Sequence, residues 1–480
     1  MTPEEFRAAA HELVDWITDH RITVEQRRVR PEHRAGDIVA ALPTEPPESA
    51  ESASAVLSDL ESIVAPGVTE VQHPMHFGWF PSNASLSSIL GDIASSGLAS
   101  LGISWESSPA LTEVEEVVVD WMRQLCGLSD DWKGVIQDTA STACLVAMLA
   151  ARERATDHAQ ATTGLLGFGK RLAVYTTAEA HSSVRKGALL AGFAADDLRV
   201  VDHDPWSRDM RADALQAAIE ADLAEGIVPA IVVATCGSTA TTAFDPLAAI
   251  ANLCEQHGIW MHVDAAMAGA AMILPEYRYL FHGIERSDSI SWNPHKWFGT
   301  ILDCSLMYLR DPEHLIRVMS TNPSYLLTTV GVDDETSEPT QYRDWGIPLG
   351  RRFRSLKLWY QLRADDIDEI RERLRIDIDN ARWFAAQIET MDGWNLCAPV
   401  RMQTVTVRHH PSGMSPAEVS DHNLAWASEI NASGEAFLTP SKLDDQWMVR
   451  VSVGAEPTQR HHLERLLELM QKAAVAVEAE

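Results

Sequence analysis

The feature that most constrains the fold of this 480-residue sequence is a series of short apolar runs, each followed by a polar turn or by small residues. These runs are Leu172–Tyr175, Leu198–Val201, Ala230–Thr235, Trp260–Asp264 and Ser305–Leu309. Turns and stretches of helical sequence separate them, and this alternation predicts an α/β domain whose mostly parallel sheet carries helices on both faces. In such a sheet, ligand-binding residues gather at the carboxyl ends of the strands.

Lys296 lies within the sequence S-W-N-P-H-K-W-F-G, which runs from Ser291 to Gly299. Its neighbours are aromatic or rigid, and burial among them would lower the pKa of the lysine because apolar surroundings disfavour the ammonium form. An uncharged lysine amine can form a Schiff base. Taken alone, the segment also fits a lysine whose stem covers apolar surface while its ammonium group stays in water.

Asp264 ends the predicted strand W-M-H-V-D and is followed by two small residues, Ala265 and Ala266. Enzymes that use pyridoxal phosphate pair the lysine that binds the cofactor with an acidic residue that keeps the pyridine nitrogen protonated. Asp264 and Lys296 fit that pair.

The motifs H-V-D-A-A and N-P-H-K-W resemble the group II pyridoxal-phosphate decarboxylases, and most closely the aromatic L-amino-acid decarboxylases that act on DOPA, tryptophan or tyrosine. The resemblance runs from about Pro66 to Tyr360. It implies a fold-type I enzyme with pyridoxal 5'-phosphate as its cofactor. It also implies a homodimer whose active sites are shared between chains.

The resemblance implies a role for each matching residue. Lys296 would bind the cofactor, Asp264 would hold the proton on its ring nitrogen, and His181 would stack over the ring. Tyr325 would be the lid tyrosine that protonates the α-carbon of the substrate. Further cofactor-binding positions are Thr139, Ala140, Ser141, Thr235, Ala266, Asn293, His295 and Gly350. Substrate-binding positions are Trp79, Phe80, Pro81, Ser82, Leu101, Ile103 and, from the partner chain, Gly350.

Several of these segments also have simpler interpretations. The aromatic stretch Gln72–Ser82 is broken by proline and glycine and has the composition of a loop that caps a core. Gly134–Ser141 is predicted as a turn that opens an apolar helix, whose N-terminus would suit a phosphate. Asp138 stands there in place of the glycine common in relatives, so we expect its carboxylate to turn away from the phosphate. His181, at a predicted helix start, is also a typical capping residue.

The chain has a formal charge of −30, which argues against nucleic acid and anionic membranes as partners. Its six cysteines lack the close spacing of a metal site or a disulfide framework, so we expect reduced thiols in a cytoplasm. The start M-T-P-E-E-F lacks the pattern of a signal peptide, and no apolar stretch approaches the ~20 residues that span a bilayer. The pairs His409-His410 and His461-His462 are expected at the surface, and no metal is assigned.

The N-terminal segment is predicted to begin with a capped helix from Thr2, with Phe6, Leu13 and Ile17 on one face. Such a helix needs a partner surface, and the resemblance implies an arm packed across a homodimer. Residues 26–54 are expected to be extended. We therefore expect an N-terminal arm at residues 1–85, a cofactor-binding large domain at 86–356 and an α+β small domain at 357–480.

The pocket residues favour an aromatic substrate, because Trp79, Phe80, Leu101 and Ile103 are apolar. Gly350 matches the small residue of plant enzymes that act on indoles, which favours tryptophan over phenylalanine, tyrosine, DOPA and 5-hydroxytryptophan. A glutamate or histidine decarboxylase would need a more polar pocket. A decarboxylating aldehyde synthase is the other alternative, but such relatives replace the lid tyrosine or the stacking histidine.

Overall fold

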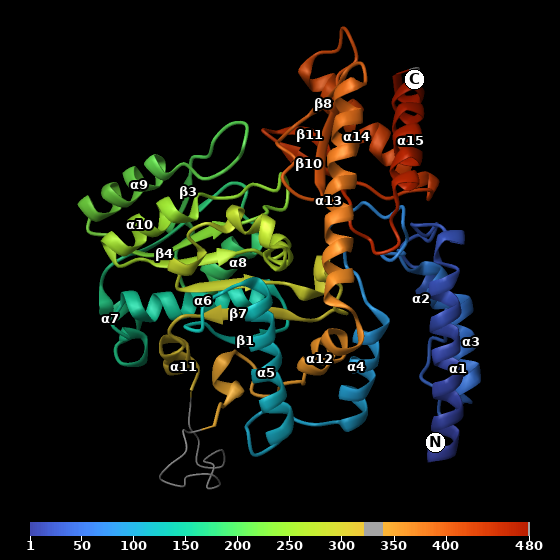
Figure 1. Cartoon of the computed structure of the whole chain (residues 1–480), viewed down its shortest axis with the longest axis horizontal. Coiled ribbons are helices and arrows are strands. Elements are labelled where there is room, and N and C mark those ends of the chain that lie inside the picture. Colours follow the sequence, from blue (N-terminus) through green and yellow to red (C-terminus); the bar gives the residue numbers. More distant parts are fainter. Residues whose placement is uncertain (321–338, 479–480) are drawn as a thin grey trace. The chain divides into compact units, whose positions relative to one another are not determined.

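The computed structural model describes residues 1–320 and 339–478, and the chain divides into two compact units (Figure 1). The smaller unit combines Met1–Pro81, Asp377–Cys397 and Gln403–Glu480, and the larger combines Ser82–Ile376 with Ala398–Met402. Tyr325, the predicted lid tyrosine, lies outside the described residues.

The larger unit is built on a seven-stranded sheet with the order β1-β7-β6-β5-β4-β2-β3. Its strands are β1 (Lys133–Gln137), β2 (Leu172–Thr177), β3 (Leu198–Val201), β4 (Val228–Thr235), β5 (Trp260–Asp264), β6 (Ser289–Trp292) and β7 (Ser305–Leu309). Strand β7 runs antiparallel to both of its neighbours, and all other neighbouring strands are parallel. The predicted mostly parallel sheet is confirmed.

Helices cover both faces of this sheet, as predicted (Figure 1). They are α4 (Leu86–Leu98), α5 (Pro109–Cys126), α6 (Ala140–Ala155), α7 (Gly164–Phe168), α8 (Ser182–Leu190), α9 (Ala212–Ala224), α10 (Leu247–His257), α11 (Glu313–Met319) and α12 (Ser355–Ala364). Helices α6 and α8 share a buried core with Ile231 and Val233 of β4 and Trp260 of β5. This face of the sheet therefore lies under α6 and α8.

The turn predicted for residues 134–141 is wrong for its first half, because these residues form strand β1. The strand is short, and its burial increases from exposed Lys133 to buried Gln137, so Val135 and Ile136 are its only apolar side chains. A Cβ on Gly134 would lie 2.4 Å from Val119 Cγ1, which explains the glycine. Helix α6 begins at Ala140, close to the predicted position.

The smaller unit contains an antiparallel sheet with the order β10-β11-β9-β8, which confirms the predicted α+β small domain. Its strands are β8 (Trp394–Leu396), β9 (Thr404–His409), β10 (Thr439–Leu443) and β11 (Gln446–Ser452). Its helices include α14 (Pro416–Ser433), α15 (Arg460–Glu478) and the end of α13 (Ile367–Thr390). Helix α14 packs against both β11 and α15.

The N-terminal part of this unit begins with α1 (Pro3–Ile22), which has the predicted capping box between Thr2 and Glu5. The expectation of extended chain over residues 26–54 is wrong in part, because α2 (Asp37–Ala41) and the start of α3 (Ala53–Asp59) interrupt it. Both are short helices that sequence periodicity resolves poorly. Among the described helices, none has the length and apolar character needed to cross a membrane.

Two expectations about side chains have different outcomes. None of the six cysteines, all of which the structure describes, forms a disulfide. The expectation that the histidine pairs lie at the surface is wrong for His409 and His462, which are buried. His409 ends a strand that packs into the small-unit core, and His462 lies on the inner face of α15.

Candidate active site

The carboxyl ends of β4, β5 and β6 bring together Thr235, Asp264 and Ser291, which are paired in register. Side chains of one strand alternate between the two faces of a sheet. Because Val233 and Trp260 face α6 and α8, Thr235 and Asp264 face the same side. Asp264 is 5% exposed, so its carboxylate is a buried acidic group at the strand ends.

Backbone hydrogen bonds connect Asp264 to the lysine. The Ala266 N–H donates to Asp264 Oδ1 at 3.0 Å, the Asn293 N–H donates to the Ala266 carbonyl at 3.0 Å, and the Lys296 N–H donates to the Asn293 carbonyl at 3.0 Å. We call this set of predicted site residues the lysine edge: Thr235, Asp264, Ala266, Asn293, His295 and Lys296. The structure brings all of them together at one edge of the sheet.

Lys296 lies in the middle of the single turn Pro294–Phe298, which follows β6. Its backbone angles, φ −99° and ψ −109°, depart from those of a helix, and the turn ends at Gly299 with φ 103°. The side chain is half-buried, between the fully buried Trp297 and the buried His295. The turn therefore fixes the backbone of Lys296 and leaves part of its side chain accessible.

His295 is fixed by the backbone of Cys304, whose N–H donates to His295 Nδ1 at 3.0 Å. Because Nδ1 accepts this hydrogen bond, the neutral ring carries its proton on Nε2. Burial, helped by the charge of the adjacent Lys296, lowers the pKa of His295 to about 4. His295 is therefore a neutral hydrogen-bond donor beside the lysine at ordinary pH.

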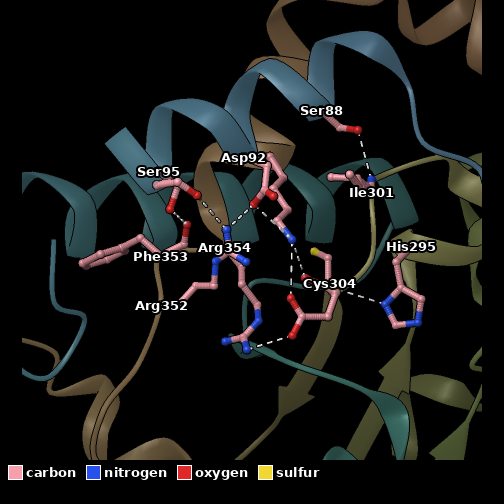
Figure 2. Close-up of polar contacts among 12 residues, drawn as sticks. Ser88, Asp92, Ser95, His295, Ile301, Cys304, Arg352, Phe353 and Arg354 are labelled. Carbon is pink, nitrogen blue, oxygen red and sulfur yellow. Dashed lines mark hydrogen bonds and ion pairs between the residues drawn. The ribbon is translucent and has the colours of Figure 1, made fainter. Parts of the chain in front are cut away.

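The turn that carries Cys304 is itself held by a network of charged groups (Figure 2). The fully buried Lys357 Nζ lies 3.2 Å from the Asp303 carbonyl and 3.4 Å from both Asp303 Oδ1 and Asp92 Oδ1. Arg354 donates to Asp303 Oδ2 at 2.9 Å. Helices α4 and α12 thus fix the segment that orients His295.

His181 caps helix α8 and also faces the lysine edge. Its Nδ1 accepts from the Ser183 N–H at 3.2 Å, so the neutral ring carries its proton on Nε2. Partial burial lowers the pKa of His181, Lys296 lowers it further, and Asp264 opposes the shift. His181 therefore caps α8 and also lies within electrostatic range of Asp264 and Lys296.

The N-terminus of α6 lies at the same edge of the sheet. Gln137, at the end of β1, pairs with Ser305, the neighbour of Cys304. Thr139 is the N-cap, while Ala140 is buried and Ser141 is exposed. Backbone N–H groups at such a helix start can hold a phosphate.

Asp138 precedes this helix, and its Oδ1 accepts from the Thr139 N–H at 2.6 Å. Burial of the Arg354 guanidinium lowers its pKa, but the hydrogen bond and charge of Asp303 raise it overall, and the charge of Asp138 adds to that increase. The positive charge of Arg354 therefore partly balances the negative charge of Asp138. That it points away from a bound phosphate stays a prediction.

The structure brings Leu101, Ile103 and Gly350 near one another but leaves them largely uncovered. The Gly102 N–H donates to the Arg351 carbonyl at 2.7 Å, and Arg351 is anchored by an ion pair to the fully buried Glu115. Leu101 is 58% exposed, Ile103 is half-buried and Gly350 is exposed. These residues form a surface on the described chain rather than a closed pocket.

Trp79, Phe80 and Pro81 belong to the smaller unit, whereas Ser82, half-buried, belongs to the larger. The Trp79 ring meets that of Phe437 edge to face at 4.9 Å, and the Arg450 guanidinium lies 4.8 Å from the centre of the Phe80 ring. Pro81 is buried. The aromatic segment therefore packs on its own unit, as a core-capping loop does.

Two buried polar atoms of the lysine edge, Thr235 Oγ1 and Asn293 Oδ1, have no hydrogen-bond partner among the described residues. Buried polar groups are normally paired, so unpaired atoms beside a buried carboxylate and a lysine mark a place for a polar ligand. A helix N-terminus suited to phosphate lies at the same edge. The residues present thus fit pyridoxal phosphate.

Sequence reasoning missed two buried residues that support this edge. Asp245 accepts from the Thr235 N–H at 2.7 Å, and burial raises its pKa to about 7. His262 lies between Ser289 Oγ and Ser291 Oγ, at 2.8 and 3.3 Å. Alternation within W-M-H-V-D could have placed His262 on the face of Asp264, whereas nothing in the sequence marks Asp245.

Comparison with known proteins agrees with this geometry. Residues 35–410 match the pyridoxal-dependent decarboxylase conserved domain. The chain is 35% identical to the phenylacetaldehyde synthase of Arabidopsis thaliana and to the aromatic-L-amino-acid decarboxylase of Bos taurus, in each case over 99% of this chain and 96% of the relative. A crystal structure of Oryza sativa TDC with PLP and tryptamine superposes with a TM-score of 0.94 at 32% identity, covering 99% of both chains.

Proposed function

This chain belongs to the pyridoxal-dependent decarboxylase family, whose cofactor is pyridoxal phosphate, and we propose that it removes the α-carboxyl group from an aromatic L-amino acid to release the arylalkylamine. The observation that carries the proposal is the lysine edge, where Lys296 lies beside a buried carboxylate and unpaired buried polar atoms. It is a carboxy-lyase acting on an amino acid.

When bound, pyridoxal phosphate supplies an aldehyde that reacts with amines and a ring that accepts the electron pair left by the departing carbon dioxide. Lys296 would provide the amine that holds it, and the carboxylate of Asp264, which is buried, would keep a proton on the pyridine nitrogen. His181 would lie over the ring with its Nε2–H available, because its Nδ1 accepts from the Ser183 N–H. The remaining cofactor-binding positions form two groups. Those proposed for the phosphate are Thr139, Ala140 and Ser141, and those proposed for the rest of the cofactor are Thr235, Ala266, Asn293, His295 and Gly350.

The substrate class is supported by the relatives and by the residues expected to face it. One relative's name specifies aromatic L-amino acids, and one similar structure, from Oryza sativa, contains tryptamine. The apolar Leu101 and Ile103 and the side-chain-free Gly350 leave room for a wide ring. Tryptophan is therefore our first choice, ahead of phenylalanine, tyrosine, DOPA and 5-hydroxytryptophan.

A decarboxylating aldehyde synthase is the second candidate function, because a phenylacetaldehyde synthase and a decarboxylase are equally similar to this chain, each at 35% identity. Retention of His181 and Tyr325 supports release of an amine. In this proposal Tyr325 donates the proton to the α-carbon of the substrate, and His181 assists from its Nε2–H.

A substrate panel with product analysis tests both choices. The five aromatic amino acids, with glutamate and histidine as controls, are each supplied to the holoenzyme, and amine, carbon dioxide, aldehyde and dissolved oxygen are measured. We expect equal amounts of amine and carbon dioxide, with tryptophan the best substrate and oxygen uptake close to background. Best turnover on glutamate or histidine would overturn the aromatic class, and stoichiometric oxygen uptake would identify the synthase.

We also propose a homodimer in a cytoplasm. Helix α1 has no buried residue, and even its apolar side chains are exposed: Phe6 by 64% and Val14 by 44%. Helix α4 exposes Leu90 and Ile93 by 53% and 49%. Such apolar faces favour a partner surface. Light scattering should give twice the mass of one chain, and a Leu90→Glu substitution should shift it towards the monomer.

A further inference from the structure

The smaller unit contains a group of side chains that the decarboxylation chemistry does not use. His409 at the end of β9, His422 on α14 and Glu478 at the end of α15 come from three different elements. Their ligand atoms all lie within 4.8 Å of one another. His409 Nδ1 is 2.9 Å from His422 Nε2 and 3.7 Å from Glu478 Oε1.

The three ligand atoms cannot all be paired with one another by hydrogen bonds. One imidazole N–H can lie between the two ring nitrogens, which satisfies the contact of 2.9 Å. The Glu478 carboxylate oxygen, 3.7 Å from the same His409 nitrogen, is then beyond hydrogen-bond distance. A cation that replaced this shared proton would meet a lone pair on each of the two ring nitrogens and on the carboxylate oxygen.

The two measured distances suit a small divalent metal. Zinc binds imidazole nitrogen and carboxylate oxygen at about 2.0–2.2 Å, so two of its ligand atoms in a tetrahedron are about 3.3–3.5 Å apart. The separations of 2.9 and 3.7 Å lie on either side of that value. Because all three ligand atoms also lie within 4.8 Å of one another, side-chain rotations can bring them to one zinc ion.

The surroundings of the two histidines are rigid on one side and open on the other. The backbone N–H of His409 donates to Asn423 Oδ1 at 2.8 Å, and the His409 ring stacks on Trp394 with the ring centres 4.6 Å apart. His422 is 4% exposed. The Glu478 side chain is 38% exposed, which leaves an entry path and a place for a water as the fourth ligand.

We propose that His409, His422 and Glu478 form a zinc site that joins α15 to α14 and β9 within the smaller unit. Its ligand set is two imidazole nitrogens and one carboxylate oxygen, which zinc accepts and which magnesium and calcium do not prefer. Because the ligands come from separate elements, the metal stabilises the end of α15.

The test uses untagged holoenzyme freed of unbound cofactor, stripped with a chelator and dialysed against zinc. We expect one zinc per chain by elemental mass spectrometry, and the visible absorption of tetrahedral cobalt when Co²⁺ replaces it. His422→Gln should abolish both signals. Glu478→Gln, at the exposed end of a helix, should weaken zinc binding at least tenfold without affecting folding.

A second group of potential ligands, Glu25, His461 and His462, provides the matched control. His461→Gln should leave the zinc content and the cobalt spectrum unchanged. The proposal is overturned if zinc is absent after dialysis, if Glu478→Gln binds it as tightly as the unaltered protein, or if His461→Gln removes it.

Discussion

The lysine edge and the expected substrate-facing residues differ in how the chain holds them. Asp264, Asn293 and His295 are buried and fixed by hydrogen bonds at 3.0 Å. Leu101 and Gly350 are exposed, and the space around Gly350 is open. The lysine edge is thus fixed by the fold of one chain, whereas the residues proposed to face the substrate need a further surface to close around them. The two sets should respond differently to substitution.

The largest effect is expected at the lysine. Lys296→Ala removes the amine that holds the cofactor, so turnover should fall by at least about 10⁴-fold. Borohydride reduction followed by peptide mass analysis should lose the cofactor adduct at this position. Lys170→Ala, an exposed control, should keep both the adduct and the activity. An adduct retained on another lysine would contradict the assignment.

The next effect concerns Tyr325, which lies outside the described residues. Tyr325→Phe keeps the ring but removes the proton donor, so amine formation should fall about 10²–10⁴-fold. Arylacetaldehyde, hydrogen peroxide and ammonia should appear in its place, as measured by chromatography and oxygen uptake. Undiminished amine formation by this variant would show that the proton comes from another group.

Lys357 tests whether the network around Asp303 supports the lysine edge. Lys357→Met removes the buried cation, but Asp303 keeps its ion pair with Arg354 and Asp92 keeps the one with Arg352. The free energy of unfolding should therefore fall by roughly 1–3 kcal/mol. Because Cys304 orients His295, cofactor affinity should also fall, measured by fluorescence titration of the apoenzyme. Lys357→Arg should restore much of both. A loss of stability with unchanged cofactor affinity would confine the network to a structural role.

Acid should weaken the protein through its buried histidines. Burial lowers the pKa of both His262 and His295 to about 4. Between pH 6.5 and about 4 these histidines bind protons in the unfolded chain but stay neutral in the folded chain. The free energy of unfolding that they contribute above pH 6.5 is therefore lost as the pH falls through this range. Each residue accounts for about 3 kcal/mol at the lower end.

The urea midpoint measured from pH 7 to pH 4 reports this loss. His262→Gln should flatten the pH dependence, and His11→Gln, on the exposed face of α1, should not. An unchanged slope for His262→Gln would mean that His262 titrates alike in the folded and unfolded chains.

The sequence predicted the elements that carry the lysine edge better than the contacts that support it. Strand β5 ends at Asp264 as predicted, because an apolar run that stops at a carboxylate is a local pattern. Asp245 was missed because no local pattern shows that its carboxylate turns back to the Thr235 N–H, and Lys357 because its partner Asp303 lies 54 residues away along the chain. The proposed zinc ligands His409, His422 and Glu478 were also missed, because they lie on three separate elements that only the fold brings together. The division into domains at residues 85 and 356 and the roles of individual site residues stay predictions.

The smallest effect, and the one that most sharpens the contrast between the two regions, is expected at Gly350. A Cβ added there meets no atom within 4 Å, so Gly350→Ser should fold as the unaltered protein does. If this residue faces the substrate from the partner chain, the hydroxymethyl group narrows the space for an indole and offers a hydrogen bond to a phenol. Discrimination of this kind is worth about 1–3 kcal/mol, so the ratio of kcat/KM for tryptophan to that for tyrosine should fall about tenfold or more.

Gly97→Ser, at another position with open space, controls for a general effect of adding serine. The visible spectrum of the cofactor should be the same in all three proteins, because the lysine edge is held independently. A changed spectrum, or an unchanged substrate ratio, would mean that Gly350 does not belong to the substrate-facing set.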